Sequence, residues 1–381
     1  MLAFHQVAHI SALARTTGFD VVWVVKDLIL PDRAKQGWSV PEVKDASVVV
    51  DPDLSKTAEL IQERQDESLH IFTGIHQEPL AKRAFELCVR GKARIALLNE
   101  PPIPGSALRN FAIRPYHVLH TLKYGSRINF ILAIGGMSVE FYKSIGYPEE
   151  KVFPYGYFVE TTPPSYSPSD GPFALSYVGQ LIERKGVDLL LSALSKLTDL
   201  DWQLKIMGAG PDETALKAMT SSLSIVDKVN FRPPGPNFEA LQLISSSDLF
   251  VLPSRHDGWG TVVNEALLCG VPVICSDRCG AADLLRDDWR GATFRSGSAD
   301  DLAAKLRSYI ERGKRTKSAA ARIQEWCGRI TGESAAAYLA SVISAAQSRQ
   351  PRDSAVPVAP WLKPATTLSS EEVALDSKPK V

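Results

Sequence analysis

The stretch from residue 252 to residue 277, LPSRHDGWGTVVNEALLCGVPVICSD, constrains the fold of this chain more than any other feature. It opens with a loop in which Asp257 precedes the turn Gly258-Trp259-Gly260. An apolar helical pattern follows at once and carries Glu265, and a β-branched run over 271–274 then predicts a buried strand. A loop, a helix start and a strand in this order form the ligand crevice of an open α/β sheet. Because the first N–H groups of a helix have no partner within it, we expect this helix start to bind an anion such as a diphosphate.

Length and composition favour an ordinary globular chain of two domains. The chain has 381 residues, of which 45% are hydrophobic and 23% are charged. The formal net charge is zero, so no overall field attracts nucleic acid or an anionic membrane, and nucleic acid is not an expected partner. No apolar run approaches the ~20 residues of a membrane span, and residues 1–15 do not resemble a secretory signal.

The five cysteines predict a reducing environment. Their number is odd, and most of them stand in apolar contexts. Cys275 and Cys279 are spaced C-x3-C, but no second Cys/His pair stands nearby in the sequence, so buried free thiols are favoured over a zinc site. We therefore expect a cytoplasmic protein.

Strand-like and helix-like segments alternate in two series. In the first series, the strand patterns are 21–25, 71–72, 95–98 and 128–134, and the helix patterns are 8–14, 79–90 and 139–145. The proline-rich stretch TTPPSYSPSDGP at 161–172 interrupts the alternation. In the second series, a helix pattern covers 187–197, and the strand patterns are 173–178, 203–207, 229–231 and 249–252. Two such series predict an α/β protein of two doubly wound domains with a cleft between them.

These patterns divide the chain into five segments. We place an N-terminal domain at 1–160, a linker at 161–172 and a C-terminal domain at 173–325. The segment 326–349 is helical by composition and could return to the N-terminal domain. The tail 350–381 is rich in Pro, Ser and Ala with few large apolar groups, so we expect it to be disordered and dispensable for folding.

Two further motifs follow predicted strands of the C-terminal domain. GQLIERKG at 179–186 precedes a helix, and its Lys185 could carry a compact charge to a phosphate, with a solvated turn as the alternative. MGAGP at 207–211 ends a strand, and its glycines allow close approach to a ligand or a tight turn. The dinucleotide fingerprint G-x-G-x-x-G is not completed, because Glu213 stands at the third glycine position.

Together these motifs resemble the nucleotide-sugar site of the retaining glycosyltransferases of family 4, with their patterns G-R-L-x-x-x-K-G and PS-x-x-E-G-F-G…E-A…G-x-P-V. Lys185 and Glu265 match this pattern, whereas Gln180 replaces an arginine, Asp257 a glutamate and Trp259 a phenylalanine. The resemblance implies a GT-B fold, in which two Rossmann-like domains face a central cleft and the C-terminal one binds the donor. The donor-binding residues that it implies are Gly179, Gln180, Lys185, Gly208, Gly210, Asp257, Gly258, Trp259, Gly260, Thr261, Val262 and Glu265.

The N-terminal domain offers the candidate for the reacting carbon. Glu100 follows a predicted strand, at a point where many family members place a histidine, and we take it with Lys185 and Asp257 as the catalytic set. Its rivals are His76, His117 and His120, and the alternative for Glu100 itself is an exposed loop acid. Family members open with a strand and a glycine-rich loop before the first helix. Here residues 1–4 are too short for both, so we expect either a late start or a missing first strand.

The sequence Asp51-Pro52-Asp53 imitates the D-x-D metal site of the other large glycosyltransferase fold. A proline between two aspartates after a strand is more simply a turn, so we expect neither a metal nor a cofactor.

The resemblance implies an enzyme of the hexosyltransferase type (EC 2.4). It would move a sugar with retention from a nucleoside-diphosphate sugar to a hydroxyl of a glycan or lipid-linked acceptor. Polysaccharide, exopolysaccharide or lipopolysaccharide assembly is the family's common setting, in which the enzyme can contact the inner membrane face. Two alternatives stay open: a nucleotide-sugar epimerase on the same fold, and a non-catalytic nucleotide-sugar-binding subunit.

Overall fold

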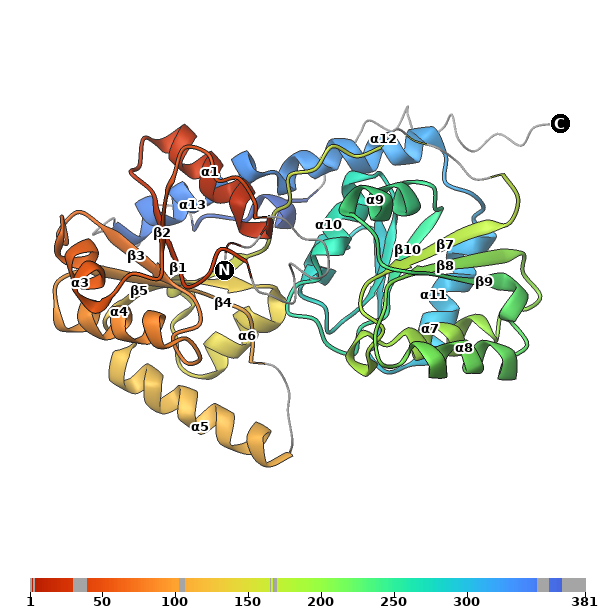
Figure 1. The fold of residues 1–381 in the computed structure, drawn as a ribbon, viewed down its shortest axis with the longest axis horizontal. Coiled ribbons are helices and arrows are strands. Elements are labelled where there is room, and N and C mark those ends of the chain that lie inside the picture. The colour runs from red at the N-terminus through yellow and green to blue at the C-terminus, as the bar shows by residue number, and fades with distance from the viewer. Residues whose placement is uncertain are drawn as a thin grey trace.

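The computed structural model describes residues 2, 4–29, 40–102, 107–164, 166, 170–347 and 356–364. Two α/β domains lie side by side in it, and α12 and α13 lead from the second domain back to the first (Figure 1). The N-terminal domain contains α1 (Phe4–Thr17), β1 (Val22–Val25), β2 (Ser47–Val50), α3 (Leu54–Gln62), β3 (Leu69–Phe72), α4 (Pro79–Arg90), β4 (Arg94–Asn99), α5 (Ala107–Tyr124), β5 (Ile128–Ile134), α6 (Gly136–Ser144), η1 (Glu149–Lys151) and β6 (Val152–Tyr155).

The C-terminal domain continues the alternation, and two α-helices and two short 3-10 turns end the described chain. Its elements are β7 (Phe173–Val178), η2 (Glu183–Lys185), α7 (Val187–Leu194), β8 (Trp202–Met207), α8 (Glu213–Ser222), η3 (Val226–Lys228), β9 (Val229–Arg232), α9 (Asn237–Ser245), β10 (Leu249–Leu252), α10 (Thr261–Leu268), β11 (Val273–Ser276), η4 (Gly280–Leu284), β12 (Gly291–Phe294) and α11 (Ala299–Glu311). After them come α12 (Lys317–Trp326), η5 (Cys327–Ile330), α13 (Gly332–Gln347) and η6 (Pro360–Leu362).

The sheet of the C-terminal domain has the strand order of a doubly wound nucleotide-binding fold. Its six strands are parallel and run β12-β11-β10-β7-β8-β9. The chain therefore starts in the middle at β7, moves outward to β9, and returns to the other side of β7 with β10. The carboxyl ends of β7 and β10 flank this switch point, which is where open α/β sheets bind ligands.

The N-terminal domain is built on a four-stranded parallel sheet of order β3-β4-β5-β6. Strands β1 and β2 pair with each other in a separate two-stranded parallel sheet, and α1 precedes both. Side chains of β5 alternate between two cores: Phe130 and Leu132 join the core that continues into the C-terminal domain, and Ile131 joins the core under α4 and α6.

Helix α13 packs against α1, so the end of the folded chain lies on the N-terminal domain (Figure 1). A β-carbon built on Gly332 would lie 2.5 Å from the carbonyl oxygen of Ala8, which shows how closely the two helices approach. Arg15 of α1 donates a hydrogen bond of 2.7 Å to Glu333 of α13.

The tail does not follow the prediction made from its composition. Residues 356–364 are ordered, and Trp361 is only 1% exposed. Its ring lies 5.5 Å from that of Phe158 and 5.7 Å from that of Tyr338. Arg329 also donates a hydrogen bond of 2.7 Å to the carbonyl of Lys363. The expected disorder of 350–381 is therefore wrong for 356–364, and 350–355 and 365–381 lie outside the described residues.

Candidate functional site

The site centres on an ion pair at the switch point of the C-terminal sheet. Lys185 ends η2, which follows β7, and Asp257 lies in the loop after β10. Lys185 Nζ donates to Asp257 Oδ2 at 2.6 Å, and the two side chains are only 15% and 12% exposed. The topology thus brings together two residues that are 72 positions apart, and both were predicted as site residues.

A second cation faces the same carboxylate. Arg184 Nη1 lies 3.9 Å from Asp257 Oδ1 and donates a hydrogen bond of 3.0 Å to the carbonyl of His256. Because Gln180 is exposed where the family pattern has an arginine, Arg184 supplies a positive charge that the motif had appeared to lack. The sequence argument had treated Arg184 only as part of a solvated turn.

Glu100 reaches this loop from the opposite domain. It follows β4, is half-buried, and its Oε1 accepts a hydrogen bond of 2.9 Å from the hydroxyl of Tyr157. A β-carbon on Gly258 would collide with the Glu100 carboxylate, so the contact requires glycine there. Burial raises the pKa of the Glu100 carboxyl above its ordinary value, and the nearby Asp257 also raises it.

The helix that follows Asp257 begins as the sequence predicted. Gly260 caps α10 with φ of 88°, a left-handed conformation that glycine adopts without strain. Among the hydrogen bonds of the described residues, none satisfies the N–H groups of Thr261 and Val262. These groups and the helix dipole make the α10 start suitable for an anion.

Glu265 lies one turn further along α10 and faces the start of α9. Its side chain is half-buried and hydrogen-bonds Asn237, the first residue of α9. Burial raises the pKa of its carboxyl from 4.5 to about 7. The charge of Glu265 can therefore change near neutral pH.

The predicted donor-binding glycines in the turns after β7 and β8 allow the two backbones to pack closely. A β-carbon on Gly208 would collide with the carbonyl oxygen of Gly179, and one on Gly210 with that of Leu181. These glycines hold the turns after β7 and β8 against each other, and no ligand contact is needed to explain them.

The side chain of Trp259 is part of the contact between the domains. It is 2% exposed and donates a hydrogen bond of 2.8 Å to Asn264, which in turn donates to the carbonyl of Tyr157 at 3.0 Å. Its ring also lies so close to Gly156 that a β-carbon there would be only 2.5 Å from it. The ring of Trp259, which was predicted to bind donor, is thus occupied by packing.

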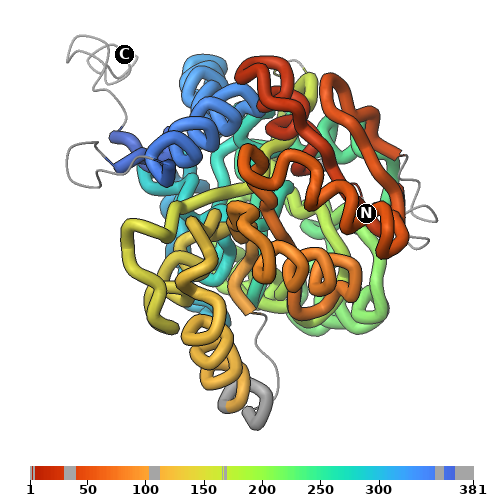
Figure 2. The backbone as a smooth tube through the Cα atoms, turned by 90° about the vertical axis from the view of Figure 1, so that its left-hand side faces the viewer, coloured from red at the N-terminus to blue at the C-terminus, as the bar shows by residue number. Residues whose placement is uncertain are grey.

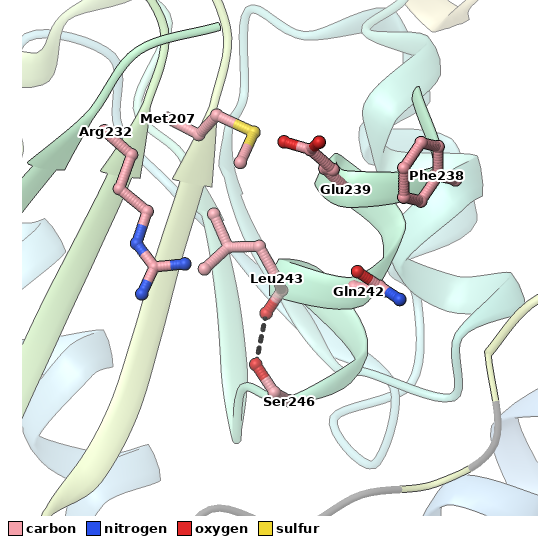
Figure 3. A pocket seen from close by; sticks show the side chains of 7 residues that line it. All are labelled: Met207, Arg232, Phe238, Glu239, Gln242, Leu243 and Ser246. Atoms are coloured by element: carbon pink, nitrogen blue, oxygen red, sulfur yellow. Dashed lines mark hydrogen bonds between the residues drawn. The ribbon is translucent and has the colours of Figure 1, made fainter. Parts of the chain in front are cut away.

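A cavity of about 470 Å³ lies beside the site, along α9. The residues that line it are Met207, Arg232, Phe238, Glu239, Gln242, Leu243 and Ser246 (Figure 3). Met207 and Arg232 are the last residues of β8 and β9, so the cavity opens at the edge of the sheet where ligands bind. The sequence argument missed it, although Phe238 and Glu239 directly follow Asn237, the partner of Glu265.

The two aspartates of the D-x-D sequence have structural roles in the N-terminal domain. Asp53 caps α3 by accepting from the backbone N–H of Lys56 at 2.7 Å, and Asp51 pairs with Lys26 at 3.0 Å. The D-x-D is thus a turn and a helix cap. Among the described residues, no group of three or more His, Cys, Asp or Glu side chains could hold a metal ion.

The three histidines form a cluster of their own. The ring of His76 lies 4.8 Å from that of His117 and 4.7 Å from that of His120. Glu100, not this cluster, contacts the Asp257 loop. All five cysteines are free and buried, as predicted. In the part of the chain that the structure describes, we find no helix with the length and apolar character of a membrane span.

Comparison with known proteins agrees with this geometry. Residues 159–326 match the family described as glycosyl transferases group 1. The D-inositol 3-phosphate glycosyltransferase of Mycobacterium sp. (strain KMS) is 29% identical over 153 residues, which cover 39% of this chain and 34% of that protein. The sulfoquinovosyl transferase SQD2 of Arabidopsis thaliana is 30% identical over 137 residues, 35% of this chain and 26% of that protein. The chain thus matches about a third or less of the length of these curated relatives.

Solved structures match over more of the chain. The lipopolysaccharide outer core galactosyltransferase WaaB, in its apo form, aligns with a TM-score of 0.63 and 17% identity over 86% of this chain and 99% of that one. Anabaena Alr3699/HepE in complex with UDP aligns with a TM-score of 0.64 and 14% identity over 86% of this chain and 100% of that one. The chain has the GT-B fold, as the sequence predicted.

Proposed function

We propose that this protein is a retaining glycosyltransferase of family 4, of the hexosyltransferase type. It moves a sugar from a nucleoside-diphosphate sugar to an acceptor hydroxyl in the assembly of a polysaccharide or lipopolysaccharide. The observation that carries the proposal is the Lys185–Asp257 pair at the switch point, which Glu100 of the other domain approaches. The match of residues 159–326 to the glycosyl transferases group 1 supports it. So does the UDP bound in the similarly folded HepE structure.

The chemistry follows from where the charges stand. As the bond between the sugar and the diphosphate breaks, negative charge develops on the leaving phosphate. Lys185 stabilises this charge together with the free N–H groups of Thr261 and Val262, and Arg184 adds a second cation. Donor binding then exchanges the partner of Lys185 from Asp257 to phosphate, and this frees Asp257 to accept hydrogen bonds from the sugar hydroxyls.

The nucleoside is held by the elements beside this pair. Glu265 accepts the ribose hydroxyls, and the cavity along α9 receives the rest of the nucleoside, because it starts next to Asn237, the partner of Glu265. Glu100 stands across the cleft and positions the reacting carbon. The acceptor hydroxyl transfers its proton to the departing phosphate, so no stronger base is required.

A ligand panel and a product assay test this function. We expect a nucleoside diphosphate such as UDP to raise the melting temperature, because it binds only the folded state. We then expect the preferred nucleotide sugar and a soluble acceptor to release nucleoside diphosphate, in excess EDTA as well as with added Mg²⁺ or Mn²⁺. Binding without release would favour the non-catalytic subunit. Epimerised donor would favour the epimerase, and loss of turnover in EDTA would contradict the metal-free mechanism.

Glu265 should make nucleotide binding depend on pH. The ionised carboxylate is the better acceptor for ribose hydroxyls, and the pKa of Glu265 is about 7. Below that pKa, binding must first remove a proton, so affinity for UDP should rise as the pH increases from about 6 to about 8 and then level off. The check is calorimetric titration of UDP into wild type and Glu265→Gln across this range.

The phosphate of UDP also titrates in this pH range and changes the affinity for both proteins. The informative quantity is therefore the ratio of the UDP affinity of wild type to that of Glu265→Gln. We expect the advantage of wild type over Glu265→Gln to grow with pH. A ratio that stays constant would mean that Glu265 does not bind the nucleotide through its charge.

A further inference from the structure

Tyr157 connects Glu100 to the loop of the opposite domain. Its hydroxyl donates a hydrogen bond of 2.9 Å to Glu100 Oε1, and its backbone carbonyl accepts one of 3.0 Å from the side chain of Asn264 on α10. Asn264 in turn accepts a hydrogen bond of 2.8 Å from the indole of Trp259, the residue after Gly258. Because the Glu100 carboxylate lies against Gly258, these contacts form a closed ring through both domains.

The ring of Tyr157 is held in place by two further aromatic contacts. It lies 3.9 Å from the ring of His5 on α1 and 6.3 Å from that of Trp259. The next residue, Phe158, donates a backbone hydrogen bond of 3.1 Å to the carbonyl of His5. Helix α1 lies alongside α13 in both views of the molecule, so the helix that supports Tyr157 is itself held by packing (Figures 1 and 2). The hydroxyl therefore has little freedom to leave Glu100.

The direction of this hydrogen bond favours an ionised Glu100. Burial raises the pKa of the Tyr157 hydroxyl well above its ordinary value, and the neighbouring Glu100 raises it further, so the hydroxyl stays protonated and donates. A carboxylate accepts such a bond more strongly than a neutral carboxyl group does. Burial, the largest effect, raises the pKa of Glu100, and Asp257 raises it as well, whereas the Tyr157 hydroxyl lowers it.

Donor binding increases the importance of this one hydrogen bond. Against the effect of burial, Arg184 and Lys185 also lower the pKa of Glu100. In the proposed function both cations turn to the diphosphate, whose own negative charge disfavours a second anion nearby. Of these three groups that favour the carboxylate, the Tyr157 hydroxyl is the one that the diphosphate does not take. It keeps Glu100 charged when positive charge develops on the sugar carbon.

We propose that Tyr157 is a positioning residue of the transfer reaction, whose hydroxyl holds the Glu100 carboxylate against the Gly258 turn and keeps it ionised. This role rests on the proposed function, in which Glu100 acts at the reacting carbon. The alternative is a hydrogen bond that only stabilises the contact between the domains. Such a bond would contribute to the melting temperature, but it would leave the pH dependence of turnover unchanged.

The titration of Glu100 can be measured by NMR without any nucleotide sugar. The full chain is isotope-labelled at the side-chain carboxyl carbon of glutamate, and the signal of Glu100 is assigned by its loss in Glu100→Gln. In Tyr157→Phe, which keeps the aromatic ring, we expect the midpoint of this signal to rise by about one pH unit or more, because a hydrogen bond to the charged form is lost.

Tyr155→Phe is the matched control for this titration. The Tyr155 hydroxyl is buried two residues earlier in the chain and has no hydrogen-bond partner among the described residues. Its removal should leave the Glu100 midpoint at the wild-type value. Both variants keep the ring, so both should melt close to the wild-type temperature.

The pH profile of turnover shows whether this titration matters for transfer. At saturating donor, kcat of Tyr157→Phe should fall about tenfold on the acidic limb and return toward the wild-type value as the pH rises, because one pH unit is a tenfold change in the ionised fraction there. The KM for the donor should change little. Any contribution of Glu265 is common to both proteins and cancels in their ratio. In the Glu100→Gln background, Tyr157→Phe should cause no further loss, because the hydroxyl acts through Glu100.

An unshifted Glu100 midpoint in Tyr157→Phe overturns the proposal, whatever the activity. A kcat that is lower by the same factor at every pH, or a further loss in the Glu100→Gln background, overturns it as well. If the midpoint shifts as expected but wild type transfers no sugar, the proposed function fails and the positioning role fails with it. The two proposals are thus tested by separate measurements.

Discussion

Lys185→Ala should lower kcat by about 100-fold or more, the loss measured when a charged contact to the transition state is removed. Lys185 is the cation closest to Asp257, and in the proposed mechanism it passes to the leaving phosphate. Arg184 remains as a weaker substitute, because it approaches the same carboxylate at 3.9 Å. Arg184→Ala should therefore cost less than Lys185→Ala, and the double variant should cost more than either.

The loss of kcat in Lys185→Ala must be distinguished from an effect of lower protein stability. Lys185→Ala leaves Asp257 as a buried carboxylate without its closest partner, which lowers stability as well. Adding Asp257→Asn removes that stranded charge, so the double variant should recover much of the melting temperature while turnover stays low. Lys196→Ala is the control, because Lys196 forms an exposed ion pair with Asp300 in the same domain. If Lys185→Ala turns over as fast as wild type, Lys185 does not stabilise the leaving phosphate.

The sequence could predict Lys185 and Asp257 because both lie in motifs between a strand and the next helix of a recognisable α/β alternation. In a parallel sheet, strand ends meet at one edge, so local patterns suffice to bring such residues together. The strands β5, β7 and β10 have the predicted bounds for the same reason: each is an apolar run with clear ends. Where the apolar run is short or interrupted, as in β6 and β12, the alternation gave no separate element.

Arg184 and Tyr157 show what local patterns miss. Arg184 reads as one of three charged residues in a turn, and only the 3-10 geometry of η2 shows that it faces Asp257. Tyr157 contacts Glu100 from a segment 57 residues away, at a contact between the domains that no periodicity encodes.

For the tail, the prediction of disorder rested on the overall composition and overlooked the packing of one residue, Trp361. A segment rich in Pro, Ser and Ala usually cannot bury enough apolar surface to become ordered. Trp361 changes that balance, because its ring fits between Phe158, which follows β6, and Tyr338 of α13. A single large aromatic residue can dominate the packing of a short segment.

Trp361→Ala should therefore destabilise the protein by about 3–5 kcal/mol, the usual cost of removing a fully buried aromatic side chain. Trp361 is 1% exposed, and its ring packs against those of Tyr155, Phe158 and Tyr338. Its indole Nε1 has no hydrogen-bond partner among the described residues, so packing accounts for its contribution. Trp361→Phe should then retain most of the stability. The measurement is chemical unfolding of the full chain, with Val358→Ala, at an exposed position of the same segment, as control.

Two truncations locate the effect along the tail. Removing 356–381 should destabilise the protein as much as Trp361→Ala, or more, because it also removes the carbonyl of Lys363 that accepts from Arg329. Removing only 365–381 keeps every described contact and should leave the unfolding curve unchanged. If Trp361→Ala and the longer truncation both unfold as wild type does, the tail docks without stabilising the fold. The prediction from composition would then be correct that the tail is dispensable for folding, although it was wrong that residues 356–364 are disordered.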